Sequence, residues 1–320
     1  IAQEGGSQVT AANGAFSDLM KSISAGKFTF TGELEPEKIG AMKEVIEGAK
    51  KLVGHVVAAN VTDIPQSFAY MNSLGPSYVI QHEVGLEAIC QMTCRDRNRL
   101  GLFADLLAAG ALGIKNILAL TGDHPSLGDM PEAKPVFDLD SASLTYLIRK
   151  ISDEGIDLHG HEIQHPPKFH VGVAINPGAR PLEPEILKLQ RKANIGAEFA
   201  QTQVVYELDA TKQFLDAIKH IQVPTLIGIC PLKSHKVAAW MDKFCPGIYI
   251  PKDLMTQLER IDKTEDKVQR KKQYRELNIE YFGNFIRELN KTTHAAGCHI
   301  MAVGFEEIVK EIIEASGVQK

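Results

Sequence analysis

Side chains able to do acid–base or hydrogen-bonding chemistry stand at the ends of short β-branched runs in this sequence. Glu33 closes the run FTFTGE. A carboxyl group in a dry pocket has a raised pKa and can act as a general acid near neutral pH. An unpaired carboxylate in a crowded interior otherwise costs several kcal/mol or takes up a proton. The other residues at such ends are Thr62, Asp63, Gln91, Thr93, Thr121, Gly122, Asp123, Asn176, Gln203, Cys230, Lys233 and Phe305.

Several of these residues also have an ordinary structural interpretation. Asp63, Asp123 and Asn176 precede a proline by one or two positions, which suits a helix N-cap or an Asx turn as well as a ligand contact. Gln203 is an uncharged donor and acceptor that could bind the amide-like edge of a pterin or flavin. The alternative for Gln203 is an interior amide satisfied by its neighbours.

Two basic clusters could hold phosphate. Arg191 and Lys192 end a helical run just before a strand-like run, where basic residues complement the helix C-terminus or contact a phosphate. RDRNR, residues 95–99, forms either a phosphate contact or a surface ion-pair cluster. The GxGxxG and GxxxxGK[ST] motifs are absent, which disfavours Rossmann and P-loop nucleotide sites. The cysteines and histidines show no metal-ligand spacing, so we expect no metal site.

Eight strand-like runs must position these residues. The runs are 28–33, 56–61, 88–93, 116–120, 170–175, 199–203, 225–229 and 298–303. Runs of helical period separate most of them, at 39–53, 97–111, 144–152, 185–195, 211–221 and 234–243. Alternating strands and helices imply parallel pairing, and eight such units close a (β/α)8 barrel with its site at the C-terminal strand ends. The sequence therefore predicts an α/β protein with a single TIM barrel.

Extensions surround this predicted barrel. Residues 1–14 are expected to form a flexible lead-in, and residues 15–320 the barrel domain. The stretch between Ile229 and Cys298 is far longer than one helix needs, which predicts an elaborated segment before the last strand. Its run LERIDKTEDKVQRKKQYRELN has alternating charges typical of a solvated surface helix.

Composition excludes several classes of protein. The chain has 320 residues, 44% hydrophobic and 23% charged, with a net charge of −5. These values exclude a disordered chain and give no basic footprint for nucleic acid or an anionic membrane. No apolar run is long enough for a membrane helix, and the first residues lack the pattern of a signal peptide. We therefore expect a cytoplasmic protein whose five cysteines are reduced.

Taken in order, the strand-end motifs resemble those of the methylenetetrahydrofolate reductases, which are flavin-dependent (β/α)8 barrels. The similarity runs from about Phe16 to Val318. Its most specific pieces are TGELEP, NVTDIP, MTCRDRN, ALTGDHP followed by KPVFDLDS, VAINPGA, LQRK before QTQ, and HIMAVG. The sequences of these motifs are most similar to those of the branch found in acetogens and some actinobacteria.

The resemblance implies roles for individual residues. Glu33 matches the catalytic acid, Asp123 the aspartate beside the flavin pyrimidine and the pterin, and Gln203 the substrate-contacting glutamine. Arg191 and Lys192 match basic residues on the phosphate side of the flavin, which favours the phosphate interpretation over the helix-end one. The further cofactor contacts implied are Thr62, Gln91, Thr121, Gly122, Asn176 and Glu185.

Four positions depart from the usual pattern of the family. Gln91 stands where many members have a flavin-contacting histidine, Thr121 replaces an arginine, and Asn176 replaces a tyrosine that packs on the cofactor. Phe305 falls where other members present an arginine to the folate tail. The resemblance implies FAD, and the changes at Thr121 and Asn176 keep FMN as an alternative.

The implied reaction is flavin-dependent reduction of 5,10-methylenetetrahydrofolate to 5-methyltetrahydrofolate, in one-carbon metabolism and, in acetogens, the methyl branch of CO2 fixation. Electrons would come from NADH or from a partner, such as a small zinc and iron–sulfur subunit, and the chain could form homo-oligomers. Two other hypotheses stay open. One is a flavin-free pterin-binding barrel that transfers a methyl group to a corrinoid protein, and the other is a flavin electron-relay subunit that needs a partner.

Overall fold

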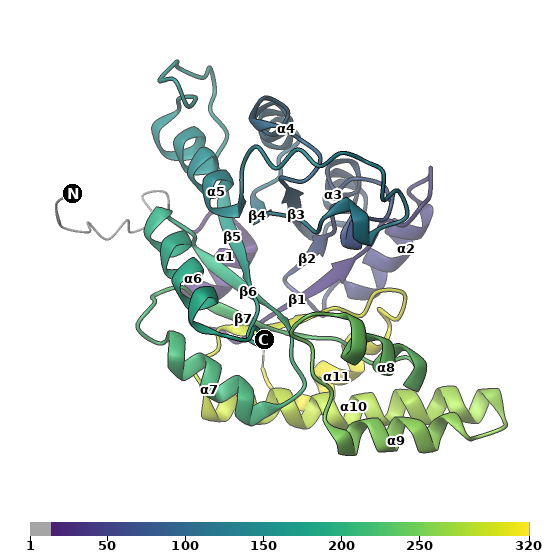
Figure 1. The fold of residues 1–320 in the computed structure, drawn as a ribbon. Coiled ribbons are helices and arrows are strands. Elements are labelled where there is room, and N and C mark those ends of the chain that lie inside the picture. Colours follow the sequence, from purple (N-terminus) through teal and green to yellow (C-terminus); the bar gives the residue numbers. More distant parts are fainter. Residues whose placement is uncertain (1–13, 320) are drawn as a thin grey trace.

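Eight parallel strands close into a barrel in a computed structural model that describes residues 14–319 (Figure 1). Each strand pairs with its neighbours in chain order, and β8 pairs with β1. The single (β/α)8 barrel expected from the sequence is therefore confirmed. The lead-in predicted for residues 1–14 lies outside the described residues, apart from Gly14. The strands are β1 (Thr29–Leu34), β2 (Ala58–Val61), β3 (Glu87–Thr93), β4 (Asn116–Leu120), β5 (His170–Ile175), β6 (Phe199–Val204), β7 (Thr225–Ile229) and β8 (Gly297–Ile300).

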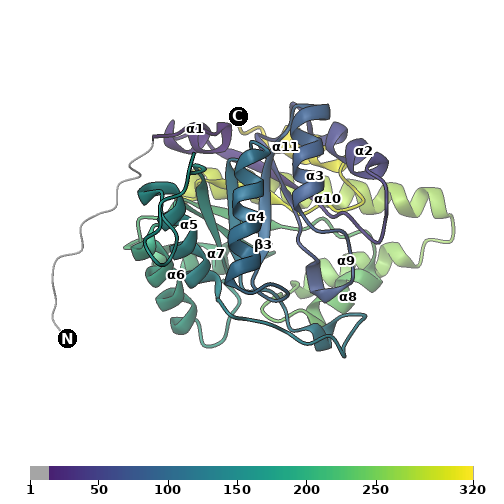
Figure 2. The ribbon, with the colours of Figure 1, turned by 90° about the horizontal axis from the view of Figure 1, so that it is seen from above.

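Helices surround the barrel and cover its outer face (Figures 1 and 2). They are α1 (Asp18–Ser24), α2 (Lys43–Leu52), α3 (Leu74–Val79), α4 (Arg99–Ala111), α5 (Ser141–Arg149), α6 (Glu183–Ile195), α7 (Leu208–Ile218), α8 (His235–Phe244), α9 (Lys252–Asp262), α10 (Lys267–Thr292) and α11 (Ile308–Ser316). Short 3-10 turns, η1 (Pro65–Ser67) and η3 (Pro125–Leu127), lie in the loops after β2 and β4. Two π turns, η2 (Ile80–Val84) and η4 (Lys150–Glu154), follow α3 and α5.

Several predicted boundaries were wrong by a few residues. The run at 298–303 pairs only as far as Ile300, and the chain turns at Gly304, whose φ is +62°. The helix predicted from residue 144 begins at Ser141, because the Asp140 carboxylate caps it by accepting from the Ser143 backbone N–H at 2.7 Å. The helix predicted at 39–53 begins at Lys43. The helix predicted at 211–221 is shifted toward the N-terminus as α7.

The predicted elaboration before the last strand is confirmed and contains α8, α9 and α10. The charged run predicted as one surface helix forms two helices, because Asp266 starts a new helix by accepting from the backbone N–H groups of Val268 and Gln269. In both views α9 and α10 lie side by side along one edge (Figures 1 and 2). The second half of α10 buries Phe282, Ile286 and Leu289.

Helix α1 closes the end of the barrel opposite the C-terminal strand ends. Its Leu19, Met20 and Ile23 pack with barrel-interior residues that include Ile89 and Phe199. Because apolar side chains fill that end, the interior opens to ligands at the C-terminal strand ends. Within residues 14–319, no helix is long and apolar enough to cross a membrane.

Candidate active site

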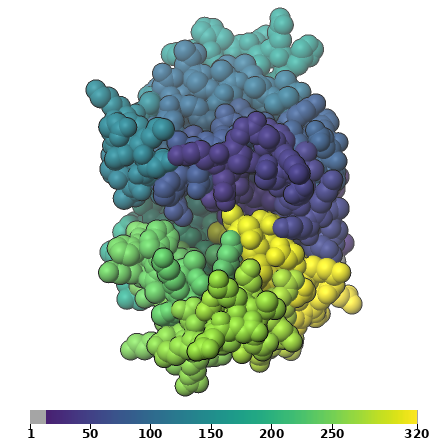
Figure 3. All heavy atoms as spheres, turned by 90° about the vertical axis from the view of Figure 1, so that its right-hand side faces the viewer, coloured from purple at the N-terminus to yellow at the C-terminus, as the bar shows by residue number. Residues whose placement is uncertain are grey.

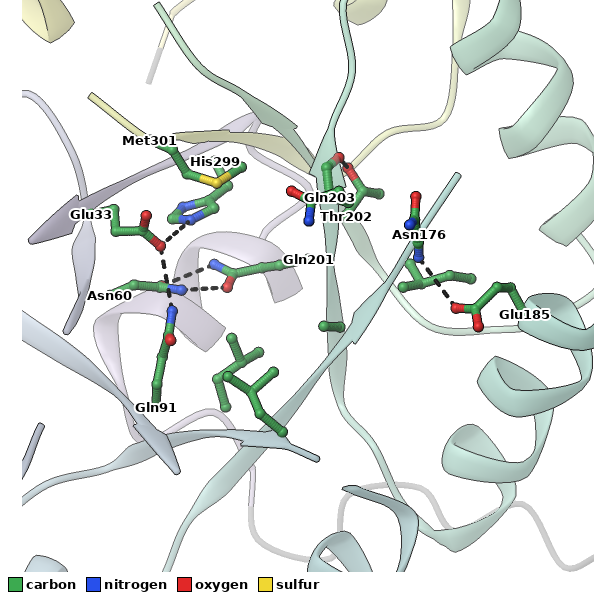
Figure 4. Close-up of a pocket in the computed structure, with 14 residues that line it drawn as sticks. Glu33, Asn60, Gln91, Asn176, Glu185, Gln201, Thr202, Gln203, His299 and Met301 are labelled. Atoms are coloured by element: carbon green, nitrogen blue, oxygen red, sulfur yellow. Dashed lines mark hydrogen bonds and ion pairs between the residues drawn. The ribbon is translucent and has the colours of Figure 1, made fainter. Parts of the chain in front are cut away.

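A cavity of about 260 Å³ lies at the C-terminal ends of the strands and opens to solvent. Side chains from seven of the eight strands or the loops that follow them line it. In the close-up, Glu33, Gln91 and His299 gather on one side and Asn176 and Glu185 on the other, with Gln203 between the two groups (Figure 4). The lining residues are Glu33, Asn60, Gln91, Leu118, Leu120, Ala174, Ile175, Asn176, Glu185, Gln201, Thr202, Gln203, His299 and Met301.

The Glu33 carboxyl group is held from two sides inside this cavity. Gln91 Nε2 donates to Glu33 Oε2 at 3.3 Å, and His299 Nε2 lies 3.3 Å from the same oxygen. The other ring nitrogen of His299, Nδ1, lies 2.9 Å from Thr31 Oγ1. The exposed fractions of the Glu33 and His299 side chains are 13% and 3%. Glu33 therefore has one fixed, largely buried orientation that still reaches the cavity.

A pair of amides forms the floor beneath Glu33. Asn60 Nδ2 donates to Gln201 Oε1 at 2.7 Å, and Gln201 Nε2 donates back to Asn60 Oδ1 at 3.1 Å. Both side chains are buried. Because each amide satisfies the other, these two residues order the floor without needing a ligand.

The strand register explains why these residues meet. Glu33 pairs with Asn60 on β2, and Thr31 pairs with His299 on β8. Residues two apart on a strand share a face, so Thr31 and Glu33 both point into the barrel. The hydrogen-bonded side chains therefore stack as neighbouring layers at one end of the interior.

Five of the residues predicted from the sequence meet in the cavity lining: Glu33, Gln91, Asn176, Glu185 and Gln203. Asn176 also makes the predicted Asx turn, because its Oδ1 accepts from the Gly178 backbone N–H at 3.0 Å. Its Nδ2 donates to the Pro246 carbonyl at 3.1 Å, which fixes the loop after α8 beside the cavity. Gln203 Oε1 accepts from the Val204 backbone N–H at 2.9 Å.

Thr62, Thr121 and Gly122 do not line the cavity. The Thr62 hydroxyl is buried at the end of β2 and has no hydrogen-bond partner in the described part of the chain. Thr121 Oγ1 accepts from the Ser141 backbone N–H at 3.0 Å, so this hydroxyl ties the long loop after β4 to the start of α5. Gly122 has a φ of +92°, and a β-carbon there would lie 3.1 Å from side-chain atoms of Thr93 and Arg95.

Asp123 also lies outside the cavity lining, with an exposed side chain, and its backbone is fixed. Ser67 Oγ lies within hydrogen-bond distance of the Asp123 carbonyl, at 2.9 Å, and Arg95 Nη1 donates to Ser67 Oγ at 3.1 Å. Ile64 and Ser67 have φ values of 53° and 60°, a region that side chains rarely adopt. A strained turn after β2 and the buried Arg95 therefore hold the loop that carries Asp123.

The two basic residues before β6 lie in different surroundings. Arg191 is exposed, with Nη1 3.8 Å from Asp140. Lys192 is half-buried, and its Nζ donates to the carbonyl of the lining residue Ala174 at 2.9 Å. Burial lowers the pKa of Lys192. An anion placed beside Lys192 would offset that cost, so the position suits a phosphate.

Glu35 is a second carboxyl group near the mouth that the sequence reasoning did not single out. It follows Glu33 by two positions and is half-buried. Burial and the neighbouring carboxylates of Glu33 and Glu37 raise its pKa to about 7, and Lys233 opposes that shift. Near neutral pH, Glu35 is therefore protonated in a large fraction of molecules.

The sequence reasoning missed Asn60, Gln201 and His299. Each is a polar residue inside a strand rather than at its end. The available signal was alternation, because Gln201 precedes Gln203 by two residues and so faces the same interior. Within residues 14–319, no group of three or more His, Cys, Asp or Glu side chains is placed to hold a metal ion.

The donor set fits a flavin or pterin ring. Side-chain amides of Gln91, Asn176 and Gln203 line the cavity above the mutually bonded Asn60–Gln201 pair, and amides pair with the imide and amide edges of such rings. The partnerless Thr62 hydroxyl at the end of β2 is a further donor near this mouth. Leu118, Leu120 and Ile175 supply apolar surface for the ring faces.

Comparison with protein families gives one match over almost the whole chain. The family described as methylenetetrahydrofolate reductase matches residues 18–317. A probable methylenetetrahydrofolate reductase (NADPH) of Caenorhabditis elegans is 26% identical over 242 residues, 74% of this chain and 33% of that protein. A 5,10-methylenetetrahydrofolate reductase of Pectobacterium carotovorum is 27% identical over 187 residues, 57% of this chain and 56% of that protein. The match therefore spans from a third to just over half the length of these curated relatives.

The fold is similar to that of a solved bacterial structure. It is a protein of Clostridium thermocellum described as binding two copies of 5-methyl-5,6,7,8-tetrahydrofolic acid. It has a TM-score of 0.62 and 17% sequence identity, and the match covers 92% of this chain and 99% of that one.

Proposed function

This chain belongs to the methylenetetrahydrofolate reductase family, and from that premise we propose that it reduces 5,10-methylenetetrahydrofolate to 5-methyltetrahydrofolate with a bound flavin. The observation that carries the proposal is the Glu33 carboxyl group, oriented by Gln91 and His299 at the mouth of the barrel. The folate ligand of the structural neighbour from Clostridium thermocellum is consistent with a folate substrate.

The reaction requires a proton donor. A bound flavin would supply the hydride that reduces the methylene carbon. Before that, the bond between the methylene carbon and N10 breaks, its electron pair stays on N10, and N10 takes up a proton. Glu33 is the proposed donor, because it is largely buried and still reaches the cavity. A positioned acid typically contributes about 10²–10⁴-fold to the rate.

His299 and Gln91 would keep Glu33 in the orientation that donation needs. Both contact Oε2, which leaves Oε1 as the oxygen free to face N10. Thr31 fixes the imidazole from its other nitrogen. The three contacts therefore favour one carboxyl orientation through the catalytic cycle.

We assign the remaining roles by position and chemistry. Gln203 and Asp123 would bind the pterin, and Asp123 would also place negative charge near the flavin pyrimidine.

Thr62 and Gln91 would contact the flavin ring. Asn176 and Glu185 border the other side of the cavity, and Arg191 and Lys192 would hold the flavin phosphate. Thr121 and Gly122 would shape the adjoining loop.

The cofactor and electron source are further proposals. The family resemblance favours FAD. Thr121, whose hydroxyl is already bonded to the Ser141 backbone, keeps FMN as the alternative. Electrons would come from NADH or from a partner subunit carrying zinc and iron–sulfur centres. We further propose that the protein acts in the cytoplasm and forms a homo-oligomer, in one-carbon metabolism that in acetogens includes the methyl branch of CO2 fixation.

The direct test is to purify the chain and measure its absorbance and its turnover. We expect a flavin band near about 450 nm, release of FAD or FMN identified by mass, and formation of 5-methyltetrahydrofolate when a reduced viologen dye supplies electrons. A colourless protein that transfers a methyl group to a corrinoid protein would contradict the proposal. Flavin reduction without any folate product would favour the electron-relay alternative.

A further inference from the structure

We propose that Lys233 binds the carboxylates of the substrate's glutamate tail, and so determines specificity for folates over pterins that lack this tail. The inference rests on the proposed function for the identity of the substrate. It concerns a residue outside the cavity lining, on the rim formed by the loops after β7, β8 and β1.

Lys233 stands at the meeting point of three loops. It follows β7 and precedes Ser234, the N-cap of α8, and its side chain is exposed. Its Nζ lies 3.0 Å from the position that a β-carbon on Gly304 would occupy, so the ammonium group crosses to the loop after β8. Its charge also acts on Glu35 after β1. In Figure 3 this face is hollowed where the purple, yellow and green parts of the chain meet.

Three other cations near this rim have carboxylate partners. Lys51 Nζ lies 3.2 Å from both Glu306 and Glu307. Arg275 forms a two-pronged pair with Glu311, below the ring of Phe305.

Lys38, on the loop after β1, pairs with Asp129. Among the residues that the structure describes, no carboxylate lies within 4.0 Å of the Lys233 ammonium group. Lys233 is therefore available to an anionic ligand.

The chemistry of the substrate indicates that its glutamate tail leaves the cavity near Lys233. In a tetrahydrofolate, N10 carries the p-aminobenzoyl group, which ends in a glutamate whose carboxylates are ionised at neutral pH. Because Glu33 is the proposed donor to N10, the benzoyl group must leave the cavity beside Glu33. Glu35 follows Glu33 by two residues, and the charges that act on Glu35 include those of Glu37 and Lys233.

The carboxylates near Lys233 make its positive charge important for binding an anionic tail. Glu33, Glu35 and Glu37 would repel an anionic tail. The raised pKa of Glu35 removes part of that repulsion near neutral pH, and Lys233 supplies the attraction. A tetrahydropteroyl amide, in which a carboxamide replaces the glutamate, has no carboxylate for Lys233 to bind, so the residue should affect only the tailed ligand.

The test compares two ligands that differ only in the tail: 5-methyltetrahydrofolate and its 5-methyltetrahydropteroyl amide analogue, in which an uncharged carboxamide replaces the glutamate. For Lys233→Met we expect the dissociation constant of the folate to rise about fivefold, as for a solvent-accessible ion pair, and that of the uncharged amide analogue to stay unchanged. Lys233→Arg should bind both ligands like the parent. Lys236→Met removes an exposed lysine of α8 and is the matched control, with no expected effect on either ligand.

Binding and turnover separate this inference from the proposed function. With the methylene substrates, Lys233→Met should raise KM for the folate and leave kcat within about twofold. A parent protein that binds both ligands equally, or a Lys233→Met variant that weakens both alike, would overturn the role of Lys233 even if reduction occurs. A tail-specific loss of binding in a protein without reductase activity would uphold Lys233 and contradict the proposed function.

Discussion

The Nε2 atom of His299 lies 3.3 Å from Oε2 of Glu33, and the two residues come from neighbouring strands of the closed barrel. The imidazole is nearly fully buried, so Glu33 meets a fixed polar partner on its inner side. This relationship makes Glu33 a group with one orientation, which is the requirement for donating a proton to a single nitrogen of a bound substrate.

Replacing His299 should lower turnover without removing the ligands. For His299→Gln we expect kcat for folate reduction to fall by about 10-fold to 100-fold, because Glu33 loses its inner partner while remaining present. KM and flavin content should change little, and the pH dependence of kcat should shift. The measurement is a pH profile of kcat with a viologen donor, and an unchanged profile would show that His299 does not orient Glu33.

The buried amide pair beneath Glu33 predicts a specific pattern of stability. Asn60→Leu or Gln201→Leu alone leaves one buried amide without its partner and should lower the free energy of unfolding by about 2 kcal/mol. The double variant removes both amides and should lose clearly less than the sum of the two. Urea unfolding of the four proteins measures this coupling, and strictly additive losses would rule out a mutual pair.

Lys192 should recognise phosphate rather than the flavin ring. For Lys192→Met we expect the dissociation constant of FMN to rise at least about tenfold, because the phosphate loses its half-buried cationic partner, and that of riboflavin to stay the same. Lys219→Met, an exposed change at the end of α7, is the control. Equal weakening of FMN and riboflavin would place Lys192 against the ring or in a purely structural role.

Glu35 should make stability depend on pH. Its pKa is raised from 4.5 to about 7, so between these values the folded protein keeps a proton that the unfolded chain has released. The free energy of unfolding therefore falls as pH rises through this window. Glu35→Gln removes that loss, and we expect the variant to be more stable than the parent by about 2 kcal/mol at pH 8 and equal to it near pH 4.5.

Urea unfolding at the two pH values measures the effect of Glu35. Glu37→Gln, the exposed carboxylate in the same loop, is its control and should change stability little at either pH. A Glu35→Gln gain of the same size at both pH values would show that burial of the charge is not its cause.

The barrel was predictable from local patterns, and the contacts inside it were not. The runs 116–120, 170–175 and 225–229 match β4, β5 and β7 at both ends. Glu33 was recognisable because a carboxylate at the end of an apolar strand has few structural explanations. Asn60 and Gln201 are 141 positions apart, and only closure of the barrel and its register brings their amides together.

Asp123 and Thr121 show a second reason why the sequence was insufficient. Their motif is local, but their positions depend on how the long loop after β4 packs. Ser67 and the buried Arg95 hold the Asp123 backbone, and Thr121 bonds to the start of α5. Loop packing of this kind follows from tertiary contacts that no spacing of residues encodes.

Glu33→Gln tests most directly whether Glu33 donates the proton that opens the substrate ring. The variant should bind flavin as the parent does and pass electrons to an artificial acceptor at the parent's rate. Its formation of 5-methyltetrahydrofolate should fall by at least about 100-fold, while Glu37→Gln stays near the parent. Folate reduction at the parental rate in Glu33→Gln would contradict this account.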